Sequence, residues 1–219
     1  MLMEEARWFG QRIAEMDPAS VFPLCNVGSS TERFRRVDQP WIDRHIFGPM
    51  RDAGRPVTHL DMKAADGVDL VGDLGDPAFA ARVRGMGFQS VFCSNLLEHV
   101  VDRAAVCSIL LDLVQPGGLL FISVPYQYPE HHDPIDTLFR PDLDELAAEF
   151  AGTERVTGEI VVDARILRYL ARSPAQLASN ALPLLAPFYR PRAWWLRVKH
   201  WGWALRRAQA SCVVLRKAT

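Results

Sequence analysis

The side chains best suited to acid–base chemistry lie together in one loop, residues 126–141. This loop contains His131, His132, Asp133 and Asp136. A histidine with its free pKa of about 6.5 accepts a proton from a hydroxyl near neutral pH, so we predict that His131, His132 and Asp136 are catalytic. A solvated turn with prolines is the alternative. Histidine and aspartate also bind metals, but adjacent residues of one loop rarely supply a complete ligand set, so we predict no metal site.

The preceding segment, residues 89–125, predicts the strand–helix–strand unit that positions this loop. An apolar run at 90–94 predicts a strand, and Asp102 can cap the helix that follows. The apolar residues of that helix recur at three- and four-residue spacing: Val106, Ile109, Leu110, Leu113 and Val114. Residues 116–118 (Pro-Gly-Gly) end the helix, and 119–124 form a second apolar run. Two parallel strands joined by a helix leave loops at their carboxyl ends that can form a site.

The rest of the chain also alternates between helix and strand patterns. We predict helices at 4–16, from Pro40 onward, at 77–86 and at 141–150, and strands at 21–27, 57–62, 68–74, 155–162 and 211–217. This alternation indicates an α/β architecture with a largely parallel sheet.

Two phrases of the sequence resemble a known family. SNLLEHV at 94–100 and PGGLLFISVP at 116–125 are similar to the segments around the fourth and fifth strands of class I S-adenosylmethionine (SAM)-dependent methyltransferases of the type-11-like group. The resemblance extends over residues 20–163. It implies a Rossmann-like, seven-stranded, mostly parallel sheet with an antiparallel last strand, helices on both faces, SAM as the cofactor and methyl transfer as the reaction.

The resemblance also implies which residues contact SAM. They follow the first four strands: Asn26, Gly28 and Ser29; Asp61 and Met62; Asp73 and Leu74; and Asn95 and Leu96. The implied role of Asp61 is to accept hydrogen bonds from both ribose hydroxyls, which a carboxylate can do, and a turn cap is the alternative. Asp73 would accept from the adenine amine, with Leu74 packed on the ring. The family usually has an acidic residue and two or three glycines in the first loop, whereas this sequence has Asn26 and Gly28.

Composition is that of one globular domain with an appendage. The chain has 219 residues and is 49% hydrophobic. Its N-terminus lacks a signal-peptide pattern, and none of its apolar runs is long enough to span a bilayer. Four cysteines without CxxC spacing (Cys25, Cys93, Cys107 and Cys212) are expected to be reduced and buried. We therefore expect a cytoplasmic protein.

Acidic and basic residues are distributed unequally along the chain. All 26 acidic residues lie at or before Asp163, and residues 164–219 hold 11 Lys and Arg residues. We predict a methyltransferase core at 1–163, a basic aromatic helical insertion at 164–210 and the last strand of the core at 211–219.

The predicted insertion is amphipathic. On a helical wheel one side contains Trp194, Val198, Trp201, Leu205 and Ala208, and the other contains Arg192, Lys199, Arg206 and Arg207. Such a segment can be a lid, a homodimer surface or a peripheral membrane contact. The membrane interpretation predicts co-sedimentation with anionic lipid vesicles that weakens with added salt.

The sequence thus predicts a SAM-dependent methyltransferase of a small-molecule or glycan acceptor, with O-methylation as the expected reaction. Glu98 and His99 are either an acid–base pair or a cap that orients their loop. One alternative function is a SAM-fold scaffold without catalysis. A nucleic-acid methyltransferase is a weaker alternative, because SNLL stands where base-modifying enzymes have an Asn/Asp-Pro-Pro-Tyr/Phe motif. We therefore expect no nucleic-acid partner.

Overall fold

The computed structural model describes residues 1–130, 135–167, 178, 181–182, 194–195, 198 and 201–219. In this part of the chain seven strands form one sheet in the order β3-β2-β1-β4-β5-β7-β6. The strands are β1 (Leu24–Val27), β2 (Val57–Asp61), β3 (Leu70–Val71), β4 (Phe88–Ser94), β5 (Val114–Pro125), β6 (Thr153–Arg165) and β7 (Arg207–Lys217). The pairs among β1 to β5 are parallel, and β7 runs antiparallel to both β5 and β6. The predicted fold class is confirmed.

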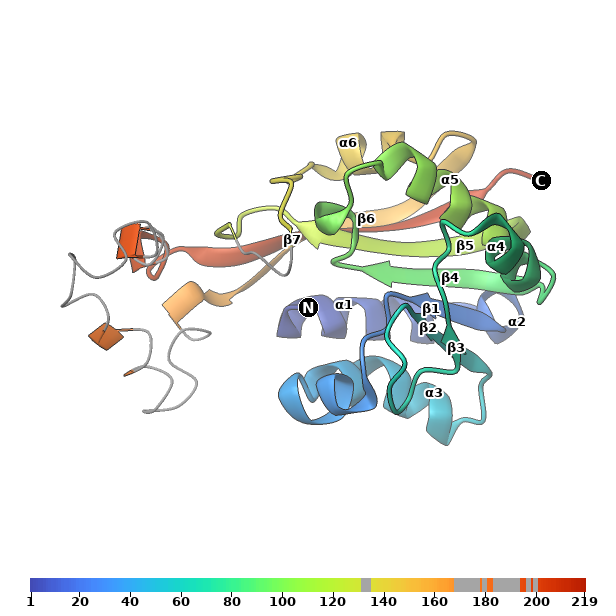
Figure 1. Cartoon of the computed structure of the whole chain (residues 1–219), viewed down its shortest axis with the longest axis horizontal. Coiled ribbons are helices and arrows are strands. Elements are labelled where there is room, and N and C mark those ends of the chain that lie inside the picture. The colour runs from blue at the N-terminus through green and yellow to red at the C-terminus, as the bar shows by residue number, and fades with distance from the viewer. Residues whose placement is uncertain (131–134, 168–177, 179–180, 183–193, 196–197, 199–200) are drawn as a thin grey trace.

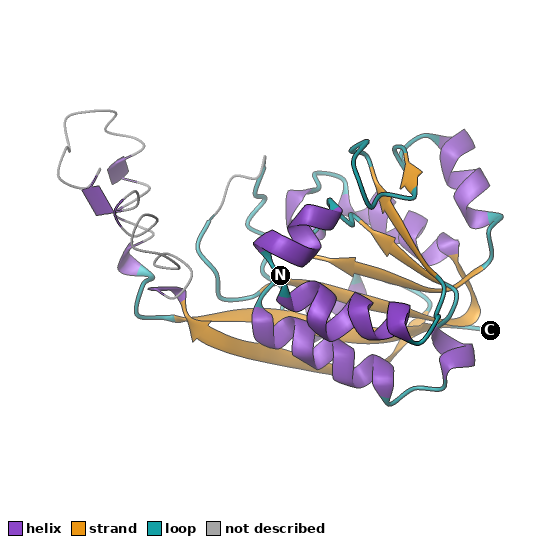
Figure 2. Cartoon of the chain, turned by 90° about the horizontal axis from the view of Figure 1, so that it is seen from below, coloured by secondary structure: helices purple, strands orange, loops and turns teal. Residues whose placement is uncertain are grey.

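Helices cover both faces of this sheet (Figure 1). The first layer contains α1 (Met3–Ala14), the π-helical turns η1 (Phe34–Asp38) and η2 (Asp43–Phe47), and α3 (Gly48–Asp52). The second contains α4 (Pro77–Arg84), α5 (Arg103–Leu113) and α6 (Leu143–Ala148), while the short helix α2 (Pro18–Val21) lies beside the start of β1. A 3-10 turn, η3 (Leu97–His99), follows β4. Figure 2 shows the sheet between these two layers.

The two helical layers bury two apolar clusters, one on each face of the sheet. Alternate residues of β5 enter alternate clusters, with Leu119 and Phe121 in one and Leu120 and Ile122 in the other. The strand is therefore apolar at consecutive positions, as expected for a parallel strand that is buried on both faces.

Helix α1 is held on the sheet by an aromatic cluster. Phe9 is fully buried, and its ring centroid lies 5.0 Å from those of Trp8 and Phe92 and 6.4 Å from that of Phe121, all in edge-to-face geometry. Edge-to-face contacts of this kind add to the free energy gained by burying the rings.

The strands differ from the predicted ones at three places. Pro116 to Gly118, predicted as a turn before the strand, lies inside β5, because the register shifts between the pairs Phe88–Val114 and Ser90–Leu119 and so accommodates the extra residues. The first strand begins at Leu24 instead of Val21, because the short helix α2, capped by Asp17, includes Val21. The third strand is limited to two residues.

The last two strands are longer than predicted. β6 continues to Arg165, and β7 begins at Arg207 instead of 211. Arg207 and Ala208 are therefore in a strand, and Leu205 and Arg206 lie in the turn before it, so these four residues are not on the predicted helix. Trp194, Val198 and Trp201 are helical. Arg192, Lys199 and most other residues of the insertion lie outside the described residues. The antiparallel pair of β6 and β7 extends past the carboxyl ends of β4 and β5 (Figure 1).

The described base of the insertion packs on the core. Trp203 is half-buried against the cluster that contains Phe9, and the Arg206 guanidinium lies 4.5 Å from the Trp203 ring centroid. The described helices include none with the length and apolarity of a membrane span. All four cysteines are buried free thiols, as predicted.

We predict that Phe9→Ala lowers the free energy of unfolding by about 3–5 kcal/mol, because it leaves a cavity between α1 and the sheet. Urea denaturation measures this loss. Val101→Ala, at a side chain that is 82% exposed, is the control and should change stability by less than about 0.5 kcal/mol. An equal, small effect of both substitutions would contradict the packing of α1.

Candidate functional site

The loop after β1 turns sharply beside the end of β4. Gly28 has φ +69° and Ser30 has φ +52°, in the left-handed region that favours glycine. A Cβ atom on Gly28 would lie 3.4 Å from Leu96 Cδ1, so the loops after β1 and β4 are in contact. Ser29 is buried, and its amide donates to the Leu60 carbonyl (3.0 Å).

Asn26 occupies the position where the resembling family usually has an acid. Its side chain is buried and donates from Nδ2 to Nδ1 of His59 (3.0 Å), its neighbour across the β1–β2 pair. Burial lowers the pKa of His59 to about 4, so this ring is neutral and can accept the bond. Asn26 therefore joins β1 to β2 instead of presenting a charge.

Asp61 lies at the end of β2, as predicted, and joins the first two loops. Its Oδ2 accepts from the Ser30 amide (2.7 Å), and its Oδ1 accepts from the Lys63 amide (2.9 Å). A carboxylate oxygen accepts more than one hydrogen bond, so Asp61 keeps capacity for a ligand. The side chain of Met62 is 69% exposed.

The segment after β3 is tied to the same region by the backbone. The Gly72 amide donates to the Asp61 carbonyl (3.1 Å). Asp73 is exposed, and its Oδ1 accepts from the Gly75 amide (2.8 Å), whereas Leu74 is half-buried against the second apolar cluster. The adenine-binding roles implied for Asp73 and Leu74 stay predictions.

Glu5 of α1 is a polar residue of the site that sequence reasoning missed. It is fully buried, and its Oε1 accepts from the Asn95 amide group (2.8 Å) and from the hydroxyls of Ser94 (3.0 Å) and Ser123 (2.5 Å). The carboxyl ends of β4 and β5 are therefore joined through α1. The available signal was the position of Glu5, one turn before Phe9 in the apolar stripe of this helix.

Glu98 is also fully buried, and within the described residues neither of its carboxyl oxygens has a hydrogen-bond partner. His99 Nε2 lies 3.8 Å from Glu98 Oε1, and the His99 Nδ1–H donates to the Ile135 carbonyl. Burial, with a smaller contribution from the negative charge of Glu5, raises the pKa of Glu98 to about 8.

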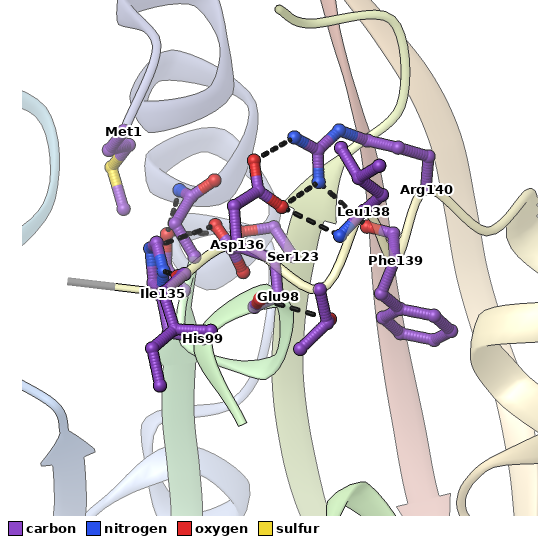
Figure 3. A network of polar contacts seen from close by, with 12 residues as sticks. Met1, Glu98, His99, Ser123, Ile135, Asp136, Leu138, Phe139 and Arg140 are labelled. Carbon is purple, nitrogen blue, oxygen red and sulfur yellow. Dashed lines mark hydrogen bonds and ion pairs between the residues drawn. The ribbon is translucent and has the colours of Figure 1, made fainter. Parts of the chain in front are cut away.

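The segment after the fifth strand packs over this pair (Figure 3). Both the amide (2.8 Å) and the hydroxyl (3.0 Å) of Thr137 donate to the Glu98 carbonyl. Asp136 is an ion-pair partner of Arg140, 2.6 Å from its Nη2, and also accepts from the Leu138 amide (2.8 Å). The catalytic role predicted for Asp136 stays a prediction. The other predicted catalytic residues, His131 and His132, lie outside the described residues.

Comparisons with known proteins support the fold. No family model matches the sequence, and no curated protein matches it. Among solved structures, a SAM-dependent methyltransferase from Geobacter sulfurreducens in complex with S-adenosylhomocysteine (SAH) has a TM-score of 0.53 and 17% identity, covering 97% of this chain and 90% of its own. Coclaurine N-methyltransferase bound to N-methylheliamine and SAH has a TM-score of 0.55 and 12% identity, covering 97% and 69%. The cyclase SpnF has a TM-score of 0.55 and 17% identity, covering 97% and 81%.

These structures define the class of fold. The chain has the Rossmann-like fold of class I SAM-dependent methyltransferases, with the strand order and the antiparallel β7 described above. SpnF is a cyclase with the same fold, so the reaction has to be argued from the residues of the site.

We predict that Glu98→Gln changes how stability depends on pH. Because the pKa of Glu98 rises from 4.5 to about 8 on folding, the folded protein retains a proton that the unfolded chain releases between these values. The stability from this proton is complete below the unfolded pKa and is lost as pH rises through about 8. Glutamine has no such proton to lose.

The measurement is urea denaturation of both proteins at about pH 5 and about pH 9, where the wild type should lose about 2–5 kcal/mol more than Glu98→Gln. Glu154→Gln, at an exposed position of β6, is the control and should follow the wild type. Parallel pH profiles of the wild type and Glu98→Gln would contradict the assignment.

Proposed function

We propose that this chain is a SAM-dependent methyltransferase. The observation that carries the proposal is the 2.7 Å hydrogen bond between the Ser30 amide and Asp61 Oδ2, at the carboxyl ends of two adjacent parallel strands. It joins a left-handed turn, where the backbone can approach a ligand, to an acid that can bind a diol. In open α/β sheets ligands bind at this edge. Two solved structures with this fold contain SAH, which supports the choice of cofactor.

The described residues fit SAM. Gly28 leaves space beside Leu96 that a side chain would fill, and Asp61 has capacity left for the ribose hydroxyls. Asn95 is fixed by Glu5 beside the same loop, where it can contact the cofactor. Bound SAM supplies a methyl group from a positively charged sulfur, and loss of the methyl group leaves this sulfur as a neutral thioether. The protein then has to place the acceptor in line with that methyl group and exclude water.

We propose O-methylation of a small-molecule or glycan acceptor that binds over the carboxyl ends of β4 and β5. A hydroxyl acceptor releases a proton as its oxygen bonds to the methyl carbon, so a base has to be nearby. His131 and His132 are the candidates in the loop after β5. His99 is a further candidate, because its ring lies beside Glu98 under the segment that follows β5, with Nε2 3.8 Å from Glu98 Oε1.

A binding or scaffold protein without catalysis is the second candidate function. It is favoured by the first loop, which contains one glycine and in which the Ser30 amide is already bonded to Asp61. Thermal-shift titrations with SAM and SAH separate the two functions, because a protein that is stabilised by neither compound would support the scaffold.

We predict that Asp61→Ala weakens SAM binding by about ten- to a hundredfold, because it removes charge-assisted hydrogen bonds to the ribose. Titration calorimetry measures the dissociation constant. Asp52→Ala, at an exposed position of α3, is the control for the lost charge and should bind as the wild type does. Unchanged affinity in a folded Asp61→Ala protein would remove Asp61 from the site.

A second substitution pair tests the acceptor side. We predict that His131→Ala and His132→Ala lower turnover, with SAM affinity retained within a few-fold, because these residues serve the acceptor and not the cofactor. Calorimetry gives the affinity, and SAH release gives the turnover. Loss of SAM binding in either variant would show that this loop contacts the cofactor instead.

A further inference from the structure

Arg35, in the π-helical turn η1, lies behind the loop that follows β1. Only 5% of the residue is exposed. Its Nη1 donates to the carbonyl oxygens of Ser29 (2.9 Å) and Ser30 (2.7 Å), and its Nη2 donates to the carbonyl oxygen of Gly67 (2.7 Å). One guanidinium thus joins the loop after β1 to the loop after β2.

The charge of Arg35 is satisfied by the backbone. Within the described part of the chain no carboxylate forms an ion pair with it, so its partners are the three carbonyl dipoles. Burial lowers the pKa of Arg35, while the more distant charges of Asp69 and Glu32 act in the opposite direction. Burying the charged guanidinium costs desolvation free energy. Charge-assisted hydrogen bonds to the three carbonyls offset that cost only while the two loops hold these carbonyls within reach of Arg35.

Arg35 and Asp61 hold complementary backbone groups of the first loop. Arg35 binds the carbonyls of Ser29 and Ser30, whereas Asp61 binds the Ser30 amide. Ser30 has φ +52°, a conformation that a serine adopts only under constraint from its surroundings. The two side chains together supply that constraint.

The contact between Arg35 and the loop after β2 requires a glycine at position 67. It has φ +75°, and a Cβ atom there would lie 2.5 Å from Glu32 Cβ and 2.9 Å from Arg35 Nη2. The two loops also meet through the Glu32 amide, which donates to the Asp66 carbonyl (2.9 Å). Only glycine allows the second loop to approach Arg35 this closely.

We propose that Arg35 is a positioning residue for the cofactor. It holds residues 28–30 and the loop 62–67 in the conformation that binds SAM, a conformation that a turn with a single glycine does not adopt unaided. This inference rests on the proposed function, because it assigns a role within the same binding site. It explains how the first loop keeps its shape with serines at positions 29 and 30.

The test uses SAH as the probe, since SAH binds without turnover. Arg35→Met removes all three hydrogen bonds, and Arg35→Lys keeps the charge but has a single nitrogen that cannot span both loops. We expect each variant to bind SAH about ten- to a hundredfold more weakly in titration calorimetry below its melting temperature. Arg36→Met is the matched control, because Arg36 is exposed and pairs with Glu32 and Asp43; its affinity should equal that of the wild type.

Amide hydrogen exchange without ligand supplies a second readout. Exchange should increase in residues 28–31 and 62–67 of the Arg35 variants and stay unchanged in β4 and β5. Wild-type SAH affinity in both folded variants, or unchanged exchange in these loops, overturns the inference. If the wild type itself does not bind SAH, the proposed cofactor is wrong, and the exchange result still decides whether Arg35 orders the loops. Should Arg35→Met not fold, Arg35→Lys carries the same test.

Discussion

Residues 119–125 of β5 are buried on both faces of the sheet, and the layout of the molecule follows from this burial. A strand that is apolar at consecutive positions cannot leave either face in water, so helices have to cover both. The parallel connections that place helices there also bring the carboxyl ends of β1, β2, β4 and β5 to one edge. The candidate site lies at that edge, because the loops that follow these strands meet there.

Buried ionisable groups then distinguish this edge from the rest of the core. Glu5 is satisfied by two hydroxyls and two N–H groups, and Asp136 by Arg140 and an amide. Arg35 is satisfied by carbonyls. Glu98 differs from these, since its carboxyl group has no hydrogen-bond partner within the described residues. An unsatisfied buried carboxyl favours the protonated state, and a carboxyl group with a raised pKa is a feature that functional sites often share.

The fold by itself leaves the chemistry open. The same architecture occurs in SpnF, which is a cyclase, and in coclaurine N-methyltransferase. The proposed function rests on two local arrangements. One is the left-handed turn that is bonded to Asp61, and the other is the buried carboxyl group beside His99, under the segment that follows β5. The first arrangement suits a nucleoside cofactor, and the second suits a base for an acceptor proton.

Much of the fold was predictable because its signals are local. Apolar runs identified the strands, Asp102 caps α5 as predicted, and α6 lies within the helix predicted at 141–150. The position of Asp61 at a strand end followed from the same reasoning. Element ends were less predictable, because the pairing of β4 with β5 overrides the Pro-Gly-Gly signal and draws those residues into the strand.

The polar contacts of the site depended on the tertiary structure. Glu5 meets Ser123 across 118 residues of sequence, and Arg35 meets Gly67 across 32. Asn26 and His59 are paired only because β1 and β2 are in register. A helix pattern identifies which face of α1 is buried, but the partner of an acid on that face is decided by how the helix packs on the sheet. Composition and periodicity therefore determined the layers and the sheet edge, whereas the packing of distant segments decided which side chains meet there.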